Sequence, residues 1–368
     1  MSSGTLAAGL TLTEVEGQIS SYLDHDGDKA RPLVVPRSGC AVAHDPSFET
    51  GSADPQKQCG FLAHARPQQL SRPGSSVYAL EESRYWSQQQ QRTLPACRFT
   101  PESAIDVSLA VLTARVTRCV FAVKSGGHAA FAGASNIDGG LAIDLQALNR
   151  ISLSADRKQT SVGAGNLWNH VYDKLSPMNL TVIGGRVSGI GIGGLTLGGG
   201  MSFFSNRHGW ACDNVHSYEI VLADGSIRQV SHKSDYADLY WALRGGGNNF
   251  GIVTRFDLAT YPQGKLWAGT QTFPFTKETS TAVNNAFYHF AVQSNSDPYA
   301  QVITSYAYSQ AQNIRVISSA LQYGLPRPNP PILSNFTSMK GSLASTLRVT
   351  DLPGLTDEFQ GLTPSGFR

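Results

Sequence analysis

Apolar and polar positions alternate along the chain with two different periods, which predict short strands interleaved with helices. Residues 102–118 repeat apolar side chains at helical spacing, directly after Pro101. Residues 120–124 and 141–145 are short apolar runs of the kind that form buried strands. The pattern also predicts an amphipathic segment at 77–91, helices at 167–175 and 279–293, strands at 97–101, 160–165, 252–256, 271–275 and 301–308, and a strand pair at 217–230.

The two ends of the chain are less regular than this middle part. Residues 1–74 are expected to form a weakly ordered leader, with a short helix near residues 12–23 and then a stretch rich in proline, glycine, serine and glutamine. After Pro262 the pattern loosens again, and residues 324–331 predict a loop. The alternation of strands and helices between the ends indicates an α+β or α/β arrangement.

The first of three glycine clusters lies at residues 123–135, which read VKSGGHAAFAGAS and follow a predicted strand. Gly126 and Gly127 allow a positive φ and a close approach of the backbone to a ligand. Consecutive N–H groups in such a turn can form an anion-binding nest, which suits a pyrophosphate. His128 follows the nest, although an isolated histidine in a turn is more often a solvated or hydrogen-bonded surface residue.

The second cluster spans residues 184–200. Gly189, Gly191 and Gly194 match the G-x-G-x-x-G spacing of a dinucleotide-binding turn. The glycines continue through residues 198–200, however, and would weaken a helix that started there. Isoleucines and leucines between the glycines favour a backbone packed against a flat ring, while a glycine-rich loop between domains explains the same pattern.

The third cluster, RGGGNNFGIVTRFDL at residues 244–258, leads into a predicted strand at 252–256. An ordinary turn before a strand competes here with a role in ligand binding. The Asp224-Gly225 pair predicts a hairpin turn between two strands. Asp213 and Asn214 are expected to cap or hydrogen-bond a local turn.

Length, composition and charge restrict the class of protein. A chain of 368 residues can bury a large core and is expected to hold two domains. Its content of 41% hydrophobic and 15% charged residues is typical of a globular protein. The net charge of +2 indicates neither nucleic acid nor an anionic membrane as a partner, and no apolar run reaches the length of a membrane span.

The cysteines and the first residues leave the compartment open. Residues 1–18 lack the basic and apolar regions of a secretory signal, whereas Asn179 and Asn335 stand in glycosylation triplets that are common by chance. The cysteines are too scattered for a zinc site and leave one unpaired if disulfides form, so no metal is expected. They are Cys40, Cys59, Cys97, Cys119 and Cys212.

Taken together and in this order, the segments resemble the FAD-linked oxidoreductases of the PCMH/vanillyl-alcohol-oxidase superfamily, and in particular fungal members of its berberine-bridge-enzyme-like branch. The resemblance runs from about Ser76 to Tyr261. No single element decides it, but the ordered set is highly specific. That set is YWSQQQ, P-x-C-x-x-x-P at residues 95–101, KSGGH, the glycine run at 189–200, GWACDN, LADG, DLYWALRGGGNNFG and IVTRF.

The resemblance implies an α+β fold in which a two-subdomain PCMH-type FAD-binding domain, residues 75–263, precedes an incomplete α+β substrate domain, residues 264–368. Family members continue past the point where this chain stops, in a segment that often supplies the catalytic base. The substrate domain is therefore expected to be partial, and no catalytic residue is assigned.

The resemblance also implies an FAD site. His128 falls on the histidine that many members bond covalently to the flavin, and residues 251–253 would run beside the adenosine end. Doubly linked members carry a cysteine two residues before the glycine run, where this chain has none, so one covalent link at most is expected. The implied cofactor-binding residues are Lys124, Ser125, Gly126, Gly127, His128, Val187, Gly189, Gly193, Gly194, Gly198, Gly199, Gly251, Ile252 and Val253.

The function implied by the resemblance is FAD-linked oxidation of a small-molecule natural product in secondary-metabolite biosynthesis. Hydride would pass to the flavin, and dioxygen would reoxidise it. Two alternatives stay open at the level of sequence. One is a truncated, non-catalytic FAD-binding relative, and the other is a nicotinamide-dependent dehydrogenase built on the G-x-G-x-x-G spacing.

Overall fold

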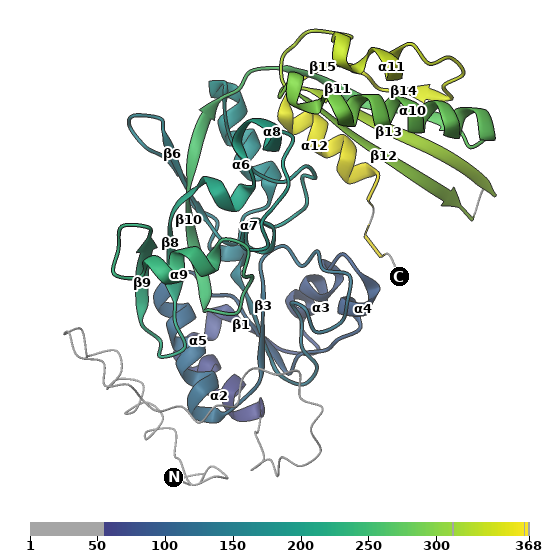
Figure 1. Ribbon diagram of the computed structural model, residues 1–368. Helices are drawn as coiled ribbons and strands as arrows, with labels where there is room; N and C mark the ends of the chain where they lie inside the picture. The colour runs from purple at the N-terminus through teal and green to yellow at the C-terminus, as the bar shows by residue number, and fades with distance from the viewer. Residues whose placement is uncertain (1–54, 311–312, 364, 367–368) are drawn as a thin grey trace, which may run out of the picture.

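The computed structural model describes residues 55–310, 313–363 and 365–366, and it contains three β-sheets with helices packed against them (Figure 1). This mixture of helices and sheets confirms the predicted α+β class. The helix expected near residues 12–23 lies outside the described residues. No helix in the described ranges is long and apolar enough to cross a membrane.

Part of the expected leader is ordered. Residues 55–74 were predicted to have little regular structure, but they form α2 (Pro55–Ala65), η1 (Pro67–Gln69) and β1 (Leu70–Ser71). A disulfide between Cys59 and Cys97 ties α2 to the next strand, β2 (Cys97–Phe99). The prediction of a weakly ordered leader was therefore wrong for these residues, because a crosslink and burial of the Cys59 and Leu62 side chains hold α2 in place.

The first sheet has the strand order β1–β2–β4–β3, and its last three strands run parallel. Helix α5 (Ala104–Thr117) crosses from β2 to β3, as the sequence predicted, and the Ser103 side chain caps it by accepting a hydrogen bond from the Asp106 N–H. The other elements of this region are α3 (Ser76–Ser83), α4 (Gln88–Gln91), β3 (Phe121–Lys124), β4 (Leu141–Asp144) and η2 (Leu145–Ala147).

The second sheet is built around β10 (Ile252–Pro262), in the strand order β5–β6–β10–β8–β9, with β7 also paired to β10. The predicted strand pair is confirmed as the hairpin of β8 and β9, which turns at Gly225 with a φ of 82°. The elements are β5 (Ile151–Leu153), β6 (Gln159–Gly163), β7 (Leu180–Val182), β8 (Val215–Val221), β9 (Ile227–Ser231), α6 (Trp168–Leu175), η3 (Ser176–Met178), α7 (Ile192–Leu197), α8 (Ser205–His208), η4 (Ala211–Asn214) and α9 (Ala237–Leu243).

The third sheet has the order β12–β13–β11–β14, and β15 also pairs with β11. Helix α10 (Lys277–Gln293) confirms the predicted helix and packs on this sheet together with α11 (Ser334–Thr337) (Figure 1). The remaining elements are β11 (Leu266–Pro274), η5 (Ser294–Ser296), β12 (Ala300–Ser309), β13 (Ile314–Tyr323), η6 (Pro331–Leu333), β14 (Ala344–Ser345), β15 (Arg348–Thr350) and α12 (Leu352–Gly361).

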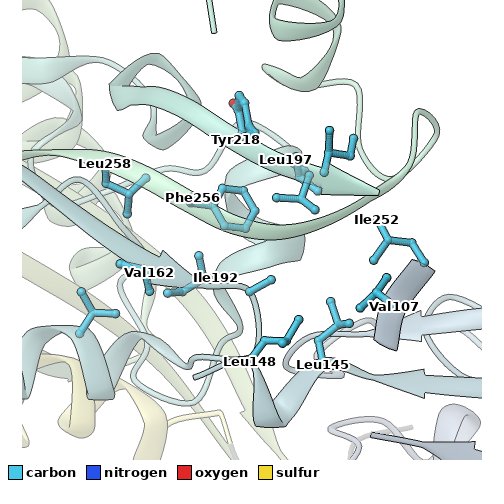
Figure 2. Packing of buried hydrophobic residues seen from close by; sticks show 14 of the residues in the cluster. Val107, Leu145, Leu148, Val162, Ile192, Leu197, Tyr218, Ile252, Phe256 and Leu258 are labelled. Atoms are coloured by element: carbon cyan, nitrogen blue, oxygen red, sulfur yellow. The ribbon is translucent and has the colours of Figure 1, made fainter. Parts of the chain in front are cut away.

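The described residues form two hydrophobic clusters. The larger one joins the first two sheets, and Figure 2 shows side chains of α5, β6, α7, β8 and β10 in it, among them Val162, Ile192 and Phe256. The smaller cluster lies between the third sheet and its helices, from Trp267 to Phe336. The two clusters support a domain division near residue 263, which stays a prediction.

Helix α12 joins the parts and has no counterpart among the predicted elements. Its Leu352 and Leu355 side chains belong to the larger cluster, although the helix follows the third sheet in the chain (Figure 1). The Phe359 ring meets the Phe203 ring edge-on, with 5.7 Å between centroids. The segment after residue 351 therefore returns to the domain that carries the first two sheets.

Buried charges connect the strands of the first sheet to α3. The Asp144 carboxylate, at the end of β4, lies 2.9 Å from the Arg98 guanidinium and 2.8 Å from Lys124 Nζ. The Glu82 carboxylate of α3 binds Arg98 as well, and Glu81 lies 3.8 Å from Lys124. All five side chains are at least nine-tenths buried, so each charge depends on its partners for the solvation that it has lost.

Replacement of Asp144 by asparagine should destabilise the protein by about 3–5 kcal/mol, because Arg98 and Lys124 would lose the carboxylate that they share. Unfolding by urea, followed by circular dichroism, measures the change. The matched control is Asp238→Asn, at an exposed position whose carboxylate accepts a hydrogen bond from the neighbouring Leu239 N–H. A loss for D144N within about 0.5 kcal/mol, the range of surface substitutions, would contradict the role given to these buried ion pairs.

Candidate cofactor site

Two glycine loops meet backbone to backbone. The turn after β3 packs against the glycine run so closely that a Cβ on Gly126 would lie 2.4 Å from the Gly191 nitrogen. A Cβ on Gly191 would in turn lie 2.3 Å from the Gly126 nitrogen. Real Cβ atoms do not approach backbone to these distances, so both positions require glycine. The close approach explains why glycines are clustered in both loops.

Gly127 continues the turn in the left-handed region, with a φ of 66°. A Cβ there would lie 2.9 Å from the Tyr85 ring, which is completely buried beneath the loop. A turn that changes backbone hand between neighbouring residues can form the anion-binding concavity that the sequence predicted.

The Ser125 hydroxyl connects this turn to the second sheet. It donates a hydrogen bond to the Ala164 carbonyl at 2.7 Å and accepts one from the Gly193 N–H at 3.2 Å. Ala164 follows β6, and its N–H donates to the Thr254 carbonyl of β10 at 2.9 Å. The first loop, the glycine run and the central strand of the second sheet therefore meet at one place.

A short helix, α7, forms inside the glycine run, although the glycines were expected to weaken any helix there. Burial overrides the low propensity, because Ile192 and Leu197 both enter the larger core (Figure 2). Gly193 and Gly194 lie in α7, and Gly198 and Gly199 end it. The strands before and after this helix, β7 and β8, both pair antiparallel with β10. This pairing is not the parallel βαβ unit of a dinucleotide-binding turn, so the nicotinamide alternative is not supported.

The third glycine cluster reaches the same region from β10. Gly251 has a φ of 146°, and a Cβ there would lie 2.6 Å from the Val221 carbonyl oxygen. Ile252 and Val253 follow as buried residues of the strand. The Gly247 N–H donates to the Leu197 carbonyl at the end of α7, at 3.0 Å. All three glycine clusters thus belong to one assembly of loops.

His128 lies at the end of the first loop, half-buried, with its imidazole stacked on the Trp86 indole. The two centroids are 4.7 Å apart and the planes differ by 15°. Burial lowers the pKa of His128, so the ring is neutral at pH 7. Its Nε2 atom is buried, and no residue in the described part of the chain offers it a hydrogen-bond partner.

Lys124 occupies a different place from the other predicted site residues. Its ammonium group points to Asp144 in the buried ion pairs described above. The Lys124 side chain therefore stabilises the turn after β3 from the buried side. A contact between Lys124 and a ligand would involve its backbone.

The segment between α3 and α4 braces the first loop, which the sequence did not predict. The Trp86 N–H donates to the Gly127 carbonyl at 3.1 Å. The Gln90 side chain donates to the Ala129 carbonyl and accepts from the Ser135 N–H, both at 2.9 Å. Residues 77–91 were predicted as one amphipathic segment, and the break between the two helices is what turns Trp86 toward the loop.

Helix α12 covers the turn before the glycine run. The Gly189 N–H donates to Gln360 Oε1 at 2.9 Å, and the Ser188 N–H donates to the Thr356 carbonyl at 3.2 Å. Val187, a predicted cofactor contact, lies in the same turn and accepts from the Ile190 N–H. The Gln360 contact was missed because no element was predicted in this segment, where Pro353 and Gly354 interrupt the helical spacing of Leu352, Leu355 and Phe359.

Asp213 and Asn214 were expected to cap or hydrogen-bond a local turn. Asp213 accepts a hydrogen bond from the Trp210 N–H, and the Asn214 amide donates to the His208 and Trp210 carbonyls. Their predicted role in a local turn is confirmed.

Among the described residues, no group of three or more histidine, cysteine or acidic side chains could hold a metal ion.

The residues present fit a dinucleotide with a flat ring. The glycine contacts keep side chains out of the turn, which leaves backbone to meet a pyrophosphate. At the end of the same turn stands a neutral histidine with a buried nitrogen that no described residue satisfies. A buried polar atom of this kind calls for an explanation, and a bond to a ligand supplies one.

Replacement of Gly126 by alanine should push the two loops apart, because the new Cβ would collide with the Gly191 backbone. We expect flavin binding to be lost and stability to fall by about 1–3 kcal/mol. Visible absorbance and thermal unfolding measure the two effects. The control is Gly60→Ala, where the Cβ meets nothing within 4 Å and should leave stability unchanged or raise it by up to about 1 kcal/mol. Flavin bound by G126A as by the unaltered protein would show that the loop contact is dispensable.

Comparison with known proteins identifies the fold. Residues 95–231 match the family described as an FAD binding domain. An FAD-dependent monooxygenase of Cochliobolus heterostrophus is 43% identical over 301 residues, which are 80% of this chain and 57% of that protein. The bifunctional solanapyrone synthase of Alternaria solani is 47% identical over 180 residues, which are 49% of this chain and 35% of that protein.

Among solved structures, a glucooligosaccharide oxidase from Acremonium strictum matches with a TM-score of 0.66 and 22% identity, over 82% of this chain and 62% of that chain. Its FAD is described as 6-S-cysteinyl, 8α-N1-histidyl FAD. The chain spans less than two thirds of the length of each of these three proteins. The family match, the curated relatives and the shared fold show that the chain belongs to the FAD-linked oxidoreductases of the PCMH/vanillyl-alcohol-oxidase superfamily.

Proposed function

We propose that this protein binds FAD across the three glycine loops, carries it on His128, and oxidises a small-molecule natural product. The observation that carries the proposal is the side-chain-free turn at Gly126 and Gly127, which ends at a neutral histidine with an unsatisfied buried nitrogen. The fungal relatives support the type of reaction, since one is named a monooxygenase and another a solanapyrone synthase.

The turn at residues 125–128 would hold the pyrophosphate. The Ser125 hydroxyl donates to the Ala164 carbonyl and accepts from the Gly193 N–H, and these two bonds fix the turn. The pyrophosphate would therefore bind to the backbone amides and not to this hydroxyl. The glycine run would pass along the other side, where Gly191 already touches Gly126. Residues 251–253, at the start of β10, would lie toward the adenosine end.

His128 would attach the flavin. A neutral imidazole has a free lone pair, and burial keeps His128 in that form at pH 7. When bound, FAD would supply the two-electron acceptor that this attachment needs, with dioxygen as the terminal oxidant. His128 would contribute the ring nitrogen, and the new bond would replace one N–H of the imidazole and one C–H of the flavin.

A second link through cysteine is not expected. The turn before the glycine run holds Arg186, Val187 and Ser188. The Ser188 N–H donates to the Thr356 carbonyl of α12. Cys212, a free cysteine that follows this turn in the sequence, is buried, and burial raises its pKa. The linkage proposed here is therefore single and histidyl, in contrast to the double linkage described for the Acremonium oxidase.

The purified chain should show the absorption spectrum of bound flavin, and the flavin should stay with the protein after acid precipitation. In His128→Ala the flavin should bind but appear in the acid supernatant, because the attachment atom is gone. His289→Ala, at an exposed position on α10, is the matched control and should behave as the unaltered chain. Absence of flavin from the unaltered chain under native conditions would overturn the proposed function, while flavin retained by H128A would overturn the attachment alone.

A further inference from the structure

The stack between Trp86 and His128 assigns a role to a residue outside the glycine loops. We propose that Trp86 is a positioning residue for flavin attachment, whose indole holds the His128 imidazole at the tilt from which a ring nitrogen reaches the flavin. The inference rests on the proposed function. It concerns the orientation of the His128 ring nitrogen that would bond to the flavin, an orientation that the glycine loops do not determine.

The histidine ring needs an outside constraint. Rotation about the Cβ–ring bond of histidine is broad, so the backbone of the loop does not fix the ring plane by itself. The buried Nε2 has no hydrogen-bond partner among the described residues that could set the plane. The indole, 4.7 Å away and within 15° of parallel, lies where it restricts this rotation.

The indole is itself held from both sides. On the loop side, the Trp86 N–H donates a hydrogen bond to the carbonyl of Gly127, the residue directly before His128. On the other side, the Trp86 Nε1–H donates to the Thr363 carbonyl at 3.3 Å, and the Gly366 N–H donates to the Trp86 carbonyl at 2.7 Å. The contact with His128 is therefore part of a fixed arrangement and not of a mobile surface side chain.

The orientation of the His128 ring nitrogen matters because the rate of bond formation depends steeply on the geometry of the reacting atoms. A misplacement of about 1 Å can slow a reaction by about a hundredfold. An aromatic stack restricts the orientation of the ring without a hydrogen bond to Nε2, so it leaves that buried nitrogen available. The indole also covers one face of the imidazole, which agrees with the direction in which burial shifts the pKa of His128.

Three variants of the full chain separate this role from simple packing. Trp86→Leu and Trp86→Met keep an apolar side chain but remove the aromatic face, whereas Trp86→Phe keeps the face and loses the bond to Thr363. The control is Trp241→Leu, the same substitution at a tryptophan that is 76% exposed. Each chain is produced without flavin and mixed with FAD, and thermal unfolding confirms that it is folded.

Two quantities are measured: the Kd for FAD before attachment, and the rate at which flavin becomes acid-precipitable. We expect W86L and W86M to bind FAD within about threefold of the unaltered chain but to attach it at least about tenfold more slowly. W86F should recover most of the rate, and W241L should not differ from the unaltered chain. A general structural role would weaken binding and attachment together and would not be rescued by phenylalanine.

The failures are distinguishable. Attachment by W86L or W86M at the unaltered rate overturns the positioning role while the proposed function stands. A W86F variant as slow as the other two shows that the hydrogen bond to Thr363, and not the stack, is what matters, which also overturns it. If the unaltered chain binds FAD without attaching it, the histidyl linkage fails and the role of Trp86 fails with it. If the unaltered chain binds no FAD, the proposed function itself fails.

Discussion

The contact between Gly126 and Gly191 is the constraint on which the site depends. Two loops, one from each of the first two sheets, approach until neither has room for a Cβ. The Ser125 hydroxyl fastens both loops to the end of β6, and a Gly247 hydrogen bond adds the third glycine cluster. A Cβ is thereby excluded at both glycines, and in the proposed site the backbone amides of the turn and His128 would meet the cofactor.

This arrangement is costly, and the rest of the fold compensates for it. Glycine gives up more conformational entropy than any other residue when it is ordered. The buried ion pairs of Asp144 with Arg98 and Lys124 fix the strand that leads into the loop. Trp86 and Gln90 hold the loop from the side, and α12 covers the turn before the glycine run. Contacts with residues far away in the sequence therefore hold this glycine loop, which has little conformational preference of its own.

The sequence predicted elements that follow from local pattern and missed those that depend on distant contacts. Residues 102–118 have helical spacing directly after Pro101, so α5 could be found, and the Asp224-Gly225 pair located the hairpin. Helix α7 could not, because burial of Ile192 and Leu197 outweighs its glycines only in the folded core. The family resemblance led to His128, but its stack on Trp86 arises from the break between α3 and α4. Ser87 caps α4 at this break, yet the amphipathic pattern of residues 77–91 was interpreted as one segment.

The most direct test of the account is the mass of the intact, denatured chain after it has been saturated with FAD. A single histidyl linkage predicts one species heavier than the polypeptide by one FAD less two hydrogens, because the new bond replaces one N–H and one C–H. Fragmentation should place the added mass on the peptide that contains His128. An unmodified mass, or a flavin attached to any other residue, would contradict the account.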